Sequence, residues 1–310
     1  MTVTENFRAE IGPYTVDRKY SGKPVYFGRH RETGREVVIK ESRISLIKNT
    51  DVGKLLLTYE AELLTMLDHP QICRIERMLA HNGKFYLVTP RAGTEDFGQF
   101  AEGNTQIGRH TIVLEDIARA LVHCHEREIA HLDVKEDNIT VDNGRGVLID
   151  FGAARKIGES HPTIYNSLIL TPSAAAPERL KGGFTTLSDT FSFALMLFRT
   201  FTGRDPFEIN DDDFLDYGSP RYERRELDAS RLGKLVLAGL EITPERRPTM
   251  REMADAIREL NSKWHRQPNG QTSEHGPASS QISPPQKKAL LRCTTASYDS
   301  GQRPLQARLS

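Results

Sequence analysis

The sequence contains little cysteine and no excess of charge of either sign. Its 310 residues include 3 cysteines, none of them in a Cys-x-x-Cys pair, so we expect no disulfide framework. Free thiols are typical of a reducing compartment, which favours the cytoplasm. The 42 lysines and arginines match the 42 aspartates and glutamates. The composition therefore does not indicate a nucleic-acid partner or a membrane surface.

Long hydrophobic runs are also absent. The most apolar run, Phe191 to Phe201, contains Ser192, Arg199 and Thr200. It falls short of the ~20 apolar residues that a membrane-spanning helix needs. The first ten residues lack a basic region followed by an apolar core, so they do not predict a signal peptide. We therefore expect a cytoplasmic protein without a membrane span.

The residues most typical of catalysis lie between positions 131 and 152. The segment HLDVKEDN sets Asp133, Lys135 and Asn138 along one short loop, and a β-branched run then leads to Asp150. Phosphoryl transfer needs a carboxylate that orients a hydroxyl, oxygen ligands for magnesium, and a lysine that offsets phosphate charge. A lone aspartate on a loop is usually an Asx turn or a helix cap. Two such motifs in this order, separated by a strand, favour catalysis instead.

These motifs resemble those of the protein kinase family, in particular its serine/threonine branch. The resemblance implies that Asp133 is the catalytic base, that Lys135 lies near the γ-phosphate, and that Asn138 and Asp150 bind magnesium. It also implies ATP and Mg²⁺ as cofactors, with Mn²⁺ as an alternative ion. The implied partner is a protein substrate with a serine or threonine acceptor.

The fold implied by the resemblance is α+β and bilobal. A small β-rich N-terminal lobe carries one helix, the family's αC, and the larger C-terminal lobe is mainly helical. We expect an N-terminal extension over residues 1–11 and a kinase domain over 12–264, with lobes at 12–90 and 93–264. The polar composition of residues 265–310 predicts a disordered tail, and docking of this tail on a partner or on the chain itself is the alternative.

In the N-terminal lobe, Lys40 ends a VVIK run that is similar to the family's VAIK. The match implies that Lys40 binds the α- and β-phosphates; a solvated charge at a sheet edge is the alternative. Apolar spacing predicts a helix from residue 50 or 51 to His69-Pro70, because proline disfavours a helical residue before it. Glu60 lies on the leucine face of this helix and matches the αC glutamate that pairs with Lys40, with Glu62 as the solvated alternative.

The loop that covers the phosphates departs from the family pattern. With Val25 as the anchor, the expected glycine positions hold Arg18, Tyr20 and Lys23, and only Gly22 remains nearby. Glycines at these positions let backbone N–H groups approach the phosphates. Gly22 and Val25 stay in the predicted nucleotide site. Lys23 could replace backbone contacts with charge, and a freely solvated turn residue is the alternative.

The run before Gly93 resembles the strand that leads into the kinase hinge. The match makes Thr89 the gatekeeper, Pro90 the carbonyl partner of the adenine amino group, and Ala92 the N–H donor. Asp96 is placed to accept from ribose hydroxyls, with plain solvent-facing polarity as the alternative. The adenine would lie between Val25 and Val38 above and Thr140 below.

Leu132 stands where most family members carry arginine, so the chain resembles the subset that lacks this arginine. That arginine usually pairs with a phosphate on the activation loop. We therefore predict that loop phosphorylation is not the on-switch, and that alanine at Thr163, Tyr165 and Ser167 leaves turnover nearly intact.

Four further positions match the family pattern in the C-terminal lobe. Thr171 matches the threonine that contacts Asp133 and Lys135, Glu178 and Arg247 match a buried ion pair, and Asp189 matches the residue that holds the catalytic loop. His123 and His125 flank a cysteine on a predicted helix. Alternate helical residues point about 200° apart, so we expect a packed cysteine and two surface histidines rather than a metal site.

The leading interpretation is an active serine/threonine protein kinase. The first alternative is a pseudokinase scaffold that binds nucleotide weakly, which the missing glycines and Leu132 favour. The second is a small-molecule kinase of the aminoglycoside type, which shares the HxDxxxxN loop but lacks the DFG…APE segment and the lysine at the position of Lys135.

Overall fold

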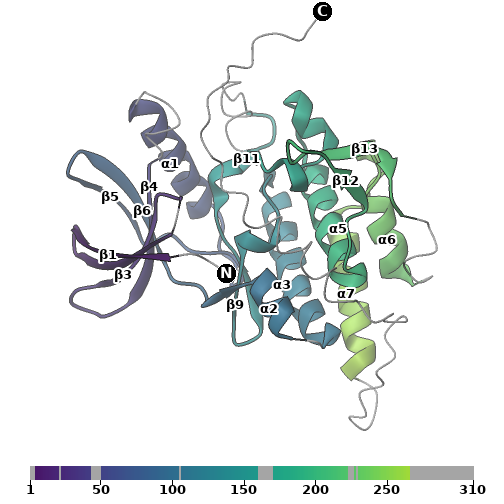
Figure 1. Ribbon diagram of the computed structural model, residues 1–310, viewed down its shortest axis with the longest axis horizontal. Helices are drawn as coiled ribbons and strands as arrows, with labels where there is room; N and C mark the ends of the chain where they lie inside the picture. The colour runs from purple at the N-terminus through teal and green to yellow at the C-terminus, as the bar shows by residue number, and fades with distance from the viewer. Residues whose placement is uncertain are drawn as a thin grey trace, which may run out of the picture.

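The computed structural model describes residues 4–20, 22–42, 50–104, 106–159, 170–222, 227 and 230–265. These residues form two lobes, a β-rich one and a mainly helical one, which confirms the expected α+β bilobal fold (Figure 1). Thr163, Tyr165 and Ser167 lie outside the described residues, as does the predicted tail from residue 266 onward.

The N-terminal lobe is one antiparallel sheet in the order β1-β2-β3-β4-β6-β5. Its strands are β1 (Thr4–Ile11), β2 (Tyr14–Tyr20), β3 (Val25–His30), β4 (Glu36–Glu41), β5 (Arg77–His81) and β6 (Lys84–Pro90). Residues 4–11, which we expected to belong to an N-terminal extension, form β1. This strand pairs with β2 from Thr4↔Tyr20 to Ile11↔Tyr14. It therefore belongs to the sheet.

The alternation of side chains along β4 places Val38 and Lys40 on the face of the sheet toward the cleft. Successive side chains of a strand point to opposite faces. Val37 and Ile39 are fully buried on one face, so Val38 and Lys40 share the other, where both are half-buried. Val38 and Lys40 therefore reach the side of the sheet that faces the second lobe.

Helix α1 (Thr50–Thr65) lies against this sheet and ends four residues before the predicted His69-Pro70 boundary (Figure 1). The N–H groups of Met66 and Leu67 bond to the carbonyls of Leu63 and Leu64, three residues back, at 3.0 and 3.2 Å. The last turn thus tightens into 3₁₀ geometry before the proline is reached. The helix therefore ends in a 3₁₀ turn, before the boundary expected from Pro70.

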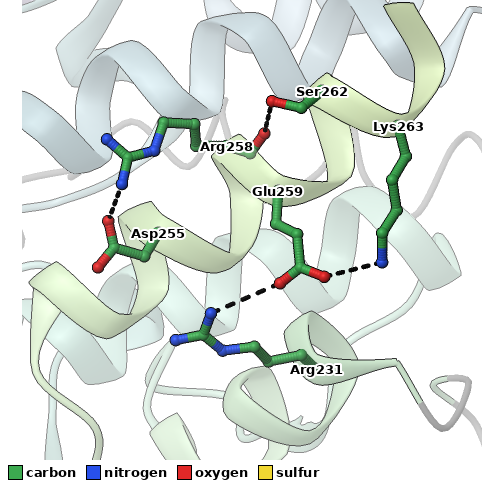
Figure 2. A pocket seen from close by; sticks show the side chains of 6 residues that line it. All are labelled: Arg231, Asp255, Arg258, Glu259, Ser262 and Lys263. Carbon is green, nitrogen blue, oxygen red and sulfur yellow. Dashed lines mark hydrogen bonds and ion pairs between the residues drawn. The ribbon is translucent and has the colours of Figure 1, made fainter. Parts of the chain in front are cut away.

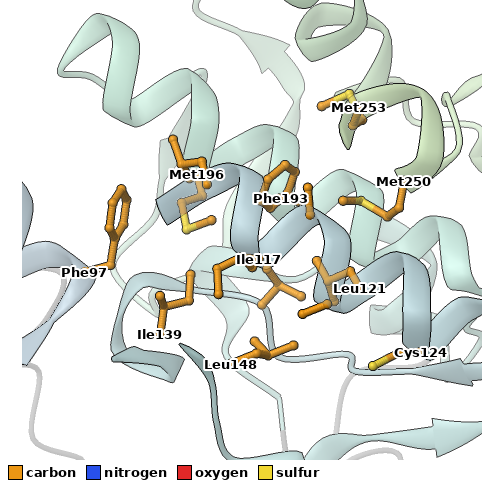
Figure 3. Packing of buried hydrophobic residues seen from close by; sticks show 14 of the residues in the cluster. Phe97, Ile117, Leu121, Cys124, Ile139, Leu148, Phe193, Met196, Met250 and Met253 are labelled. Atoms are coloured by element: carbon orange, nitrogen blue, oxygen red, sulfur yellow. The ribbon is translucent and has the colours of Figure 1, made fainter. Parts of the chain in front are cut away.

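The C-terminal lobe is built on helices around a buried central helix. They are α2 (Phe97–Gly103), α3 (Ile107–His125), α5 (Thr186–Thr202), α6 (Arg231–Gly239) and α7 (Met250–His265). Helix α5 begins at a capping box on Thr185, is buried from Ser188 to Phe198, and ends at Gly203 with φ +71. An all-round apolar helix of this kind belongs in a core. Figure 3 shows Phe193 and Met196 of α5 beside Ile117 and Leu121 of α3.

Short strands and 3₁₀ turns complete the C-terminal lobe and the loops that face the N-terminal lobe. The paired strands are β8 (Ile129–Ala130) with β11 (Arg155–Lys156), β9 (Ile139–Asp142) with β7 (Glu95–Asp96) and β10 (Arg145–Leu148), and β12 (Phe207–Ile209) with β13 (Leu215–Pro220). The 3₁₀ turns are η1 (Glu136–Asn138), η2 (Phe151–Ala153), η3 (Pro172–Ala174), η4 (Pro177–Lys181) and η5 (Pro244–Arg246). The predicted catalytic loop thus runs from β8 to β9, and Asp150 follows β10. Among the described residues, no helix is both long and apolar enough to span a membrane.

Candidate active site

Asp189 on α5 holds the backbone of the catalytic loop. Its carboxylate is 0% exposed and accepts hydrogen bonds from the N–H groups of His131 at 2.8 Å and Leu132 at 2.7 Å. Leu132 has φ +65, a region that costs a leucine strain. The two bonds to Asp189 hold this conformation. Burial alone would raise the pKa of Asp189, but the hydrogen bond and charge of His125, with the Leu132 N–H, outweigh it and lower the pKa.

His125 corrects the sequence interpretation. Its Nε2 lies 2.8 Å from the Asp189 carboxylate and its side chain is mostly buried, so it is not a surface histidine. His123 instead packs against His69, with ring centroids 5.1 Å apart. The sequence offered no signal for the His125 contact, because its partner lies 64 positions away along the chain.

Asp133, Lys135, Thr171 and Asn138 form one hydrogen-bonded cluster. Lys135 Nζ lies 2.9 Å from Asp133 Oδ2 and 2.6 Å from Thr171 Oγ1, and Thr171 donates to Asp133 Oδ1 at 2.7 Å. Asn138 Nδ2 donates to Asp133 Oδ2 at 2.7 Å. Burial raises the pKa of Asp133, but the Lys135 ammonium and the Thr171 hydrogen bond outweigh it, so the pKa is lowered. Asp133 is therefore ionised at neutral pH.

Lys40, Glu60 and Asp150 form a second cluster across the lobes. Lys40 Nζ lies 2.7 Å from Glu60 Oε2 and 2.5 Å from Asp150 Oδ1. Burial lowers the pKa of Lys40, but the Asp150 and Glu60 carboxylates outweigh it and raise the pKa. Glu62, the alternative partner, is exposed. A Cβ at Gly152 would lie 2.8 Å from Lys40 Nζ, so any other residue here would displace the Lys40 ammonium.

The two clusters belong to one site. The Ile149 N–H donates to the Asn138 carbonyl at 2.9 Å, and the charge of Asp150 acts to raise the pKa of Asp133, so the two clusters are neighbours. Asp150 has φ 59 and ψ 75, a strained conformation for a non-glycine residue. Such strain is typical of functional positions. The carboxylates predicted at 133 and 150 therefore come together in the fold.

The oxygen donors suit a magnesium ion carried on phosphates. The hydrogen bonds that the described residues give Asn138 use its amide nitrogen, which leaves the amide oxygen available as a ligand. A side-chain oxygen of Asp150 is the second candidate ligand for magnesium. The Asp150 side chain is 38% exposed. Within the described residues, no three His, Cys, Asp or Glu side chains gather to hold a metal ion alone. Magnesium typically takes one or two protein carboxylates and completes its shell with phosphate and water, so the residues fit that mode.

The predicted adenine pocket lies at the end of the sheet. Val38 pairs with Thr89 across β4 and β6, and Pro90 pairs with Val37. Ala92 follows as a half-buried residue, and a Cβ at Gly93 would lie 2.7 Å from a β9 carbonyl, so the hinge packs tightly on β9. The remaining predicted lining residues are half-buried: Val25 on β3, and Thr140 on β9.

The Asp96 side chain is a helix cap and does not simply face solvent. Its carboxylate caps α2 by accepting from the Gln99 N–H at 2.8 Å, and the Gln99 side chain completes a capping box. Capping fixes the carboxylate at the start of α2. Asp96 therefore stands at a defined position beside the hinge.

The hairpin between β2 and β3 is a tight turn. The Lys23 N–H donates to the Tyr20 carbonyl at 3.2 Å, and Gly22 supplies the positive φ of +72 that the turn requires. Lys23 Nζ lies 4.7 Å from the Tyr20 ring centroid. Burial raises the pKa of Asp137 in the catalytic loop, and the charge of Lys23 opposes the rise. Lys23 thus lies against an aromatic ring, unlike the freely solvated turn residue considered above.

Glu178 and Arg247 form a buried bridge in the C-terminal lobe. Arg247 Nη1 and Nη2 each lie 2.8 Å from one Glu178 oxygen, and the arginine side chain is 0% exposed. The Arg247 guanidinium also lies 5.0 Å from the Phe191 ring centroid. This bridge ties η4 to η5 and to α5.

A surface hollow of about 480 Å³ lies away from these clusters, between α6 and α7 (Figure 2). Its charged side chains pair with one another: Glu259 with Arg231 and Lys263, and Asp255 with Arg258. Their mutual pairing leaves no concentrated charge for a ligand, so we assign the hollow no function.

Comparisons with known proteins agree with this geometry. The family model described as protein kinase domain matches residues 21–257. The chain is 30% identical over 192 residues to the serine/threonine-protein kinase PknJ of Mycobacterium tuberculosis, covering 59% of this chain and 32% of PknJ. It is 28% identical over 204 residues to the serine/threonine-protein kinase PrkC of Bacillus subtilis, covering 64% of this chain and 31% of PrkC. The chain thus spans about a third of the length of these relatives.

Proposed function

Because the chain belongs to the protein kinase domain family, we propose that it transfers the γ-phosphoryl group of ATP to serine or threonine hydroxyls of protein substrates. The observation that carries the proposal is the single site formed by Asp133, Lys135, Asn138 and Thr171 on one side and Lys40, Glu60 and Asp150 on the other. The matched relatives are serine/threonine kinases by name, which supports the same acceptor class.

Asp133 orients the acceptor hydroxyl. Its lowered pKa keeps it ionised, so it accepts a hydrogen bond from the substrate hydroxyl and receives the proton as transfer proceeds. Thr171 and Lys135 hold its carboxylate in position. Because catalysis of phosphoryl transfer rests on positioning and charge stabilisation, a fixed carboxylate is more useful here than a strong base.

Lys40 and Lys135 supply positive charge to the nucleotide. Glu60 fixes Lys40, and Asp150 and Asn138 offer oxygen ligands for magnesium on the phosphates. Magnesium, when bound, offsets the charge of the phosphate oxygens. The tight turn at Tyr20–Lys23 takes the place of a glycine-rich loop, and Lys23 contributes charge where backbone contacts are fewer. Thr89, Pro90 and Ala92 would hold the adenine.

The proposal extends to the boundaries and location of the protein. We propose a kinase domain over residues 12–264, preceded by the strand-forming segment and followed by a tail. The buried free thiols of Cys73 and Cys124 support a reducing, cytoplasmic location.

Labelled ATP tests the activity directly. Purified protein is incubated with γ-labelled ATP, Mg²⁺ or Mn²⁺, and a generic protein acceptor, beside an Asp133→Ala variant. We expect incorporation by the wild type and none by the variant. Absence of label in both would instead support a pseudokinase scaffold, an alternative favoured by the turn that replaces the glycine loop.

A further inference from the structure

Tyr59 of helix α1 contacts residues 155–159, the segment that follows Gly152. Its hydroxyl accepts a hydrogen bond from the Lys156 N–H at 3.2 Å and donates one to Glu159 Oε2 at 3.1 Å. Glu159 Oε1 in turn lies 3.4 Å from Lys156 Nζ. Burial raises the pKa of Tyr59 and outweighs the Lys156 N–H, which lowers it, so the hydroxyl keeps its proton. One phenol oxygen thus connects α1 to two points of segment 155–159.

The Tyr59 ring also lies beside Arg155, the first residue of the segment. The Arg155 guanidinium carbon is 5.9 Å from the ring centroid, and the whole residue is only 2% exposed. Arg155 Nη1 donates to the carbonyls of Gly152 at 3.4 Å and Ala154 at 2.7 Å. These carbonyls belong to η2, the turn that Asp150 caps. The ring of Tyr59 therefore packs on the side chain that braces the backbone next to Asp150.

Segment 155–159 is itself anchored beside the catalytic loop. Arg155 and Lys156 form β11, which pairs with β8 in an antiparallel ladder. Strand β8 ends at Ala130, directly before the loop that carries Asp133. A helix bonded to this segment is therefore held in place relative to the catalytic loop, although helix and loop lie in different lobes.

Tyr59 directly precedes Glu60, whose Oε2 lies 2.7 Å from Lys40 Nζ. Successive residues of an α-helix point about 100° apart. The helix therefore presents Glu60 to the sheet and Tyr59 to the segment at the same level along its axis. A rotation of α1 that withdrew Glu60 from Lys40 would also pull the Tyr59 hydroxyl away from the Lys156 N–H. The two contacts thus support each other.

We propose that Tyr59 is a positioning residue: its hydroxyl fixes the rotation of α1, so that Glu60 holds Lys40 at the nucleotide phosphates. The inference rests on the proposed function and adds a residue that the catalytic motifs do not include. Tyr59 acts through Glu60 rather than on the substrate. Loss of its hydroxyl lowers the fraction of molecules in which the Lys40–Glu60 pair is formed, and the apparent affinity for ATP falls with that fraction.

Tyr59→Phe tests the proposal, because it removes the hydroxyl and keeps the ring. Tyr14→Phe is the matched control, since the Tyr14 hydroxyl also donates to a carboxylate of this lobe, that of Glu76 at 2.7 Å, outside the site. The full-length proteins are compared for kcat/KM with ATP and for affinity for Mg²⁺–ATP. We expect a roughly three- to tenfold loss for Tyr59→Phe, the value of one or two ordinary hydrogen bonds, and no loss for Tyr14→Phe. Equal values for the two variants would overturn the proposal.

A double-mutant cycle separates positioning from general stability. Glu60→Gln removes the charge that holds Lys40, so a residue that acts through Glu60 has little left to support in that background. Tyr59→Phe should therefore change kcat/KM by less than about twofold when it is added to Glu60→Gln. Losses that combine fully, as they do for independent sites, would contradict a role through Glu60.

Amide hydrogen exchange tests the contact without any need for catalysis. In Tyr59→Phe the Lys156 N–H loses the hydroxyl that it donates to, so peptides that cover residues 155–159 should exchange at least roughly threefold faster than in wild type and in Tyr14→Phe. If wild type transfers no phosphoryl group, the proposed function fails, and faster exchange in Tyr59→Phe still supports the link between α1 and the segment. Equal exchange in all three proteins would refute the link whatever the activity.

Discussion

Asp189→Asn should uncouple the catalytic loop from the central helix. The substitution keeps one oxygen but replaces the other with an NH₂ group. If the amide nitrogen takes the place of Oδ2, it faces the His131 N–H and His125, and a buried N–H loses its acceptor. An unpaired buried donor costs about 1–3 kcal/mol, and each lost hydrogen bond to a charged group about 1.5–3 kcal/mol. The positive φ of Leu132 also loses support. We therefore expect a loss of about 3–5 kcal/mol.

The matched control is Asp116→Asn. Asp116 is also buried and accepts a backbone N–H, that of Gly146 at 3.0 Å, and it pairs with Arg145, but it does not contact the catalytic loop. Both variants should melt earlier, by roughly 6–20 °C for the expected loss at Asp189, since each kcal/mol shifts a domain of this size by roughly 2–4 °C. Only Asp189→Asn should also lower kcat per folded molecule, measured well below the melting range. Equal kcat for the two variants would refute the role of Asp189 in positioning the loop.

The pH dependence of stability gives a second test of the same residue. The pKa of Asp189 is lowered in the folded protein, so its carboxylate stabilises the fold above its unfolded pKa of about 3.9. That contribution is lost as pH falls through the lower folded pKa. Denaturant titrations of wild type should lose stability below about pH 4, and the part due to Asp189 should be missing in Asp189→Asn. Parallel curves for the two proteins in acid would contradict the assignment.

Two further predictions concern other parts of the chain. Glu178→Gln leaves the Arg247 charge buried without its carboxylate, so urea unfolding should show a loss of about 3–5 kcal/mol; a loss under ~1 kcal/mol would mean that the pair behaves like a surface bridge. Gly152→Ala would bring a Cβ to 2.8 Å from Lys40 Nζ and displace the ammonium. Its KM for ATP should rise at least roughly tenfold, equal to about 1.4 kcal/mol of binding, with little change in melting temperature, and an unchanged KM would argue against Lys40 as a phosphate ligand.

Local spacing predicted that Asp133, Lys135 and Asn138 lie close together, because all three are on one loop. Asp133, Lys135 and Asn138 span six residues, so their mutual geometry follows from the loop alone, and Asp150 is brought near by the strand that precedes it. Spacing also predicted Glu60, since a carboxylate on a leucine face needs a partner. Short-range sequence patterns therefore predicted the positions of many residues in the candidate site.

The features that the sequence did not reveal depend on distant partners. His125 bonds to a carboxylate on another helix, and no local pattern marks it. The β1 strand pairs with β2 through backbone hydrogen bonds. Such pairing leaves no mark in the amino-acid composition, so the sequence did not predict it. Helix α1 ends in a 3₁₀ turn at Met66 and Leu67, before the boundary expected from Pro70.

The most direct test of phosphoryl transfer combines nucleotide binding with phosphosite mapping. Wild type, Asp133→Asn and Lys40→Met are titrated with Mg²⁺ and ATP, then incubated with ATP, and modified residues are identified by mass spectrometry. We predict phosphoserine and phosphothreonine on wild type alone, with nucleotide binding kept by Asp133→Asn and weakened by Lys40→Met. Wild-type protein that binds ATP yet modifies no hydroxyl, or that is modified equally in the Asp133→Asn variant, would contradict the account.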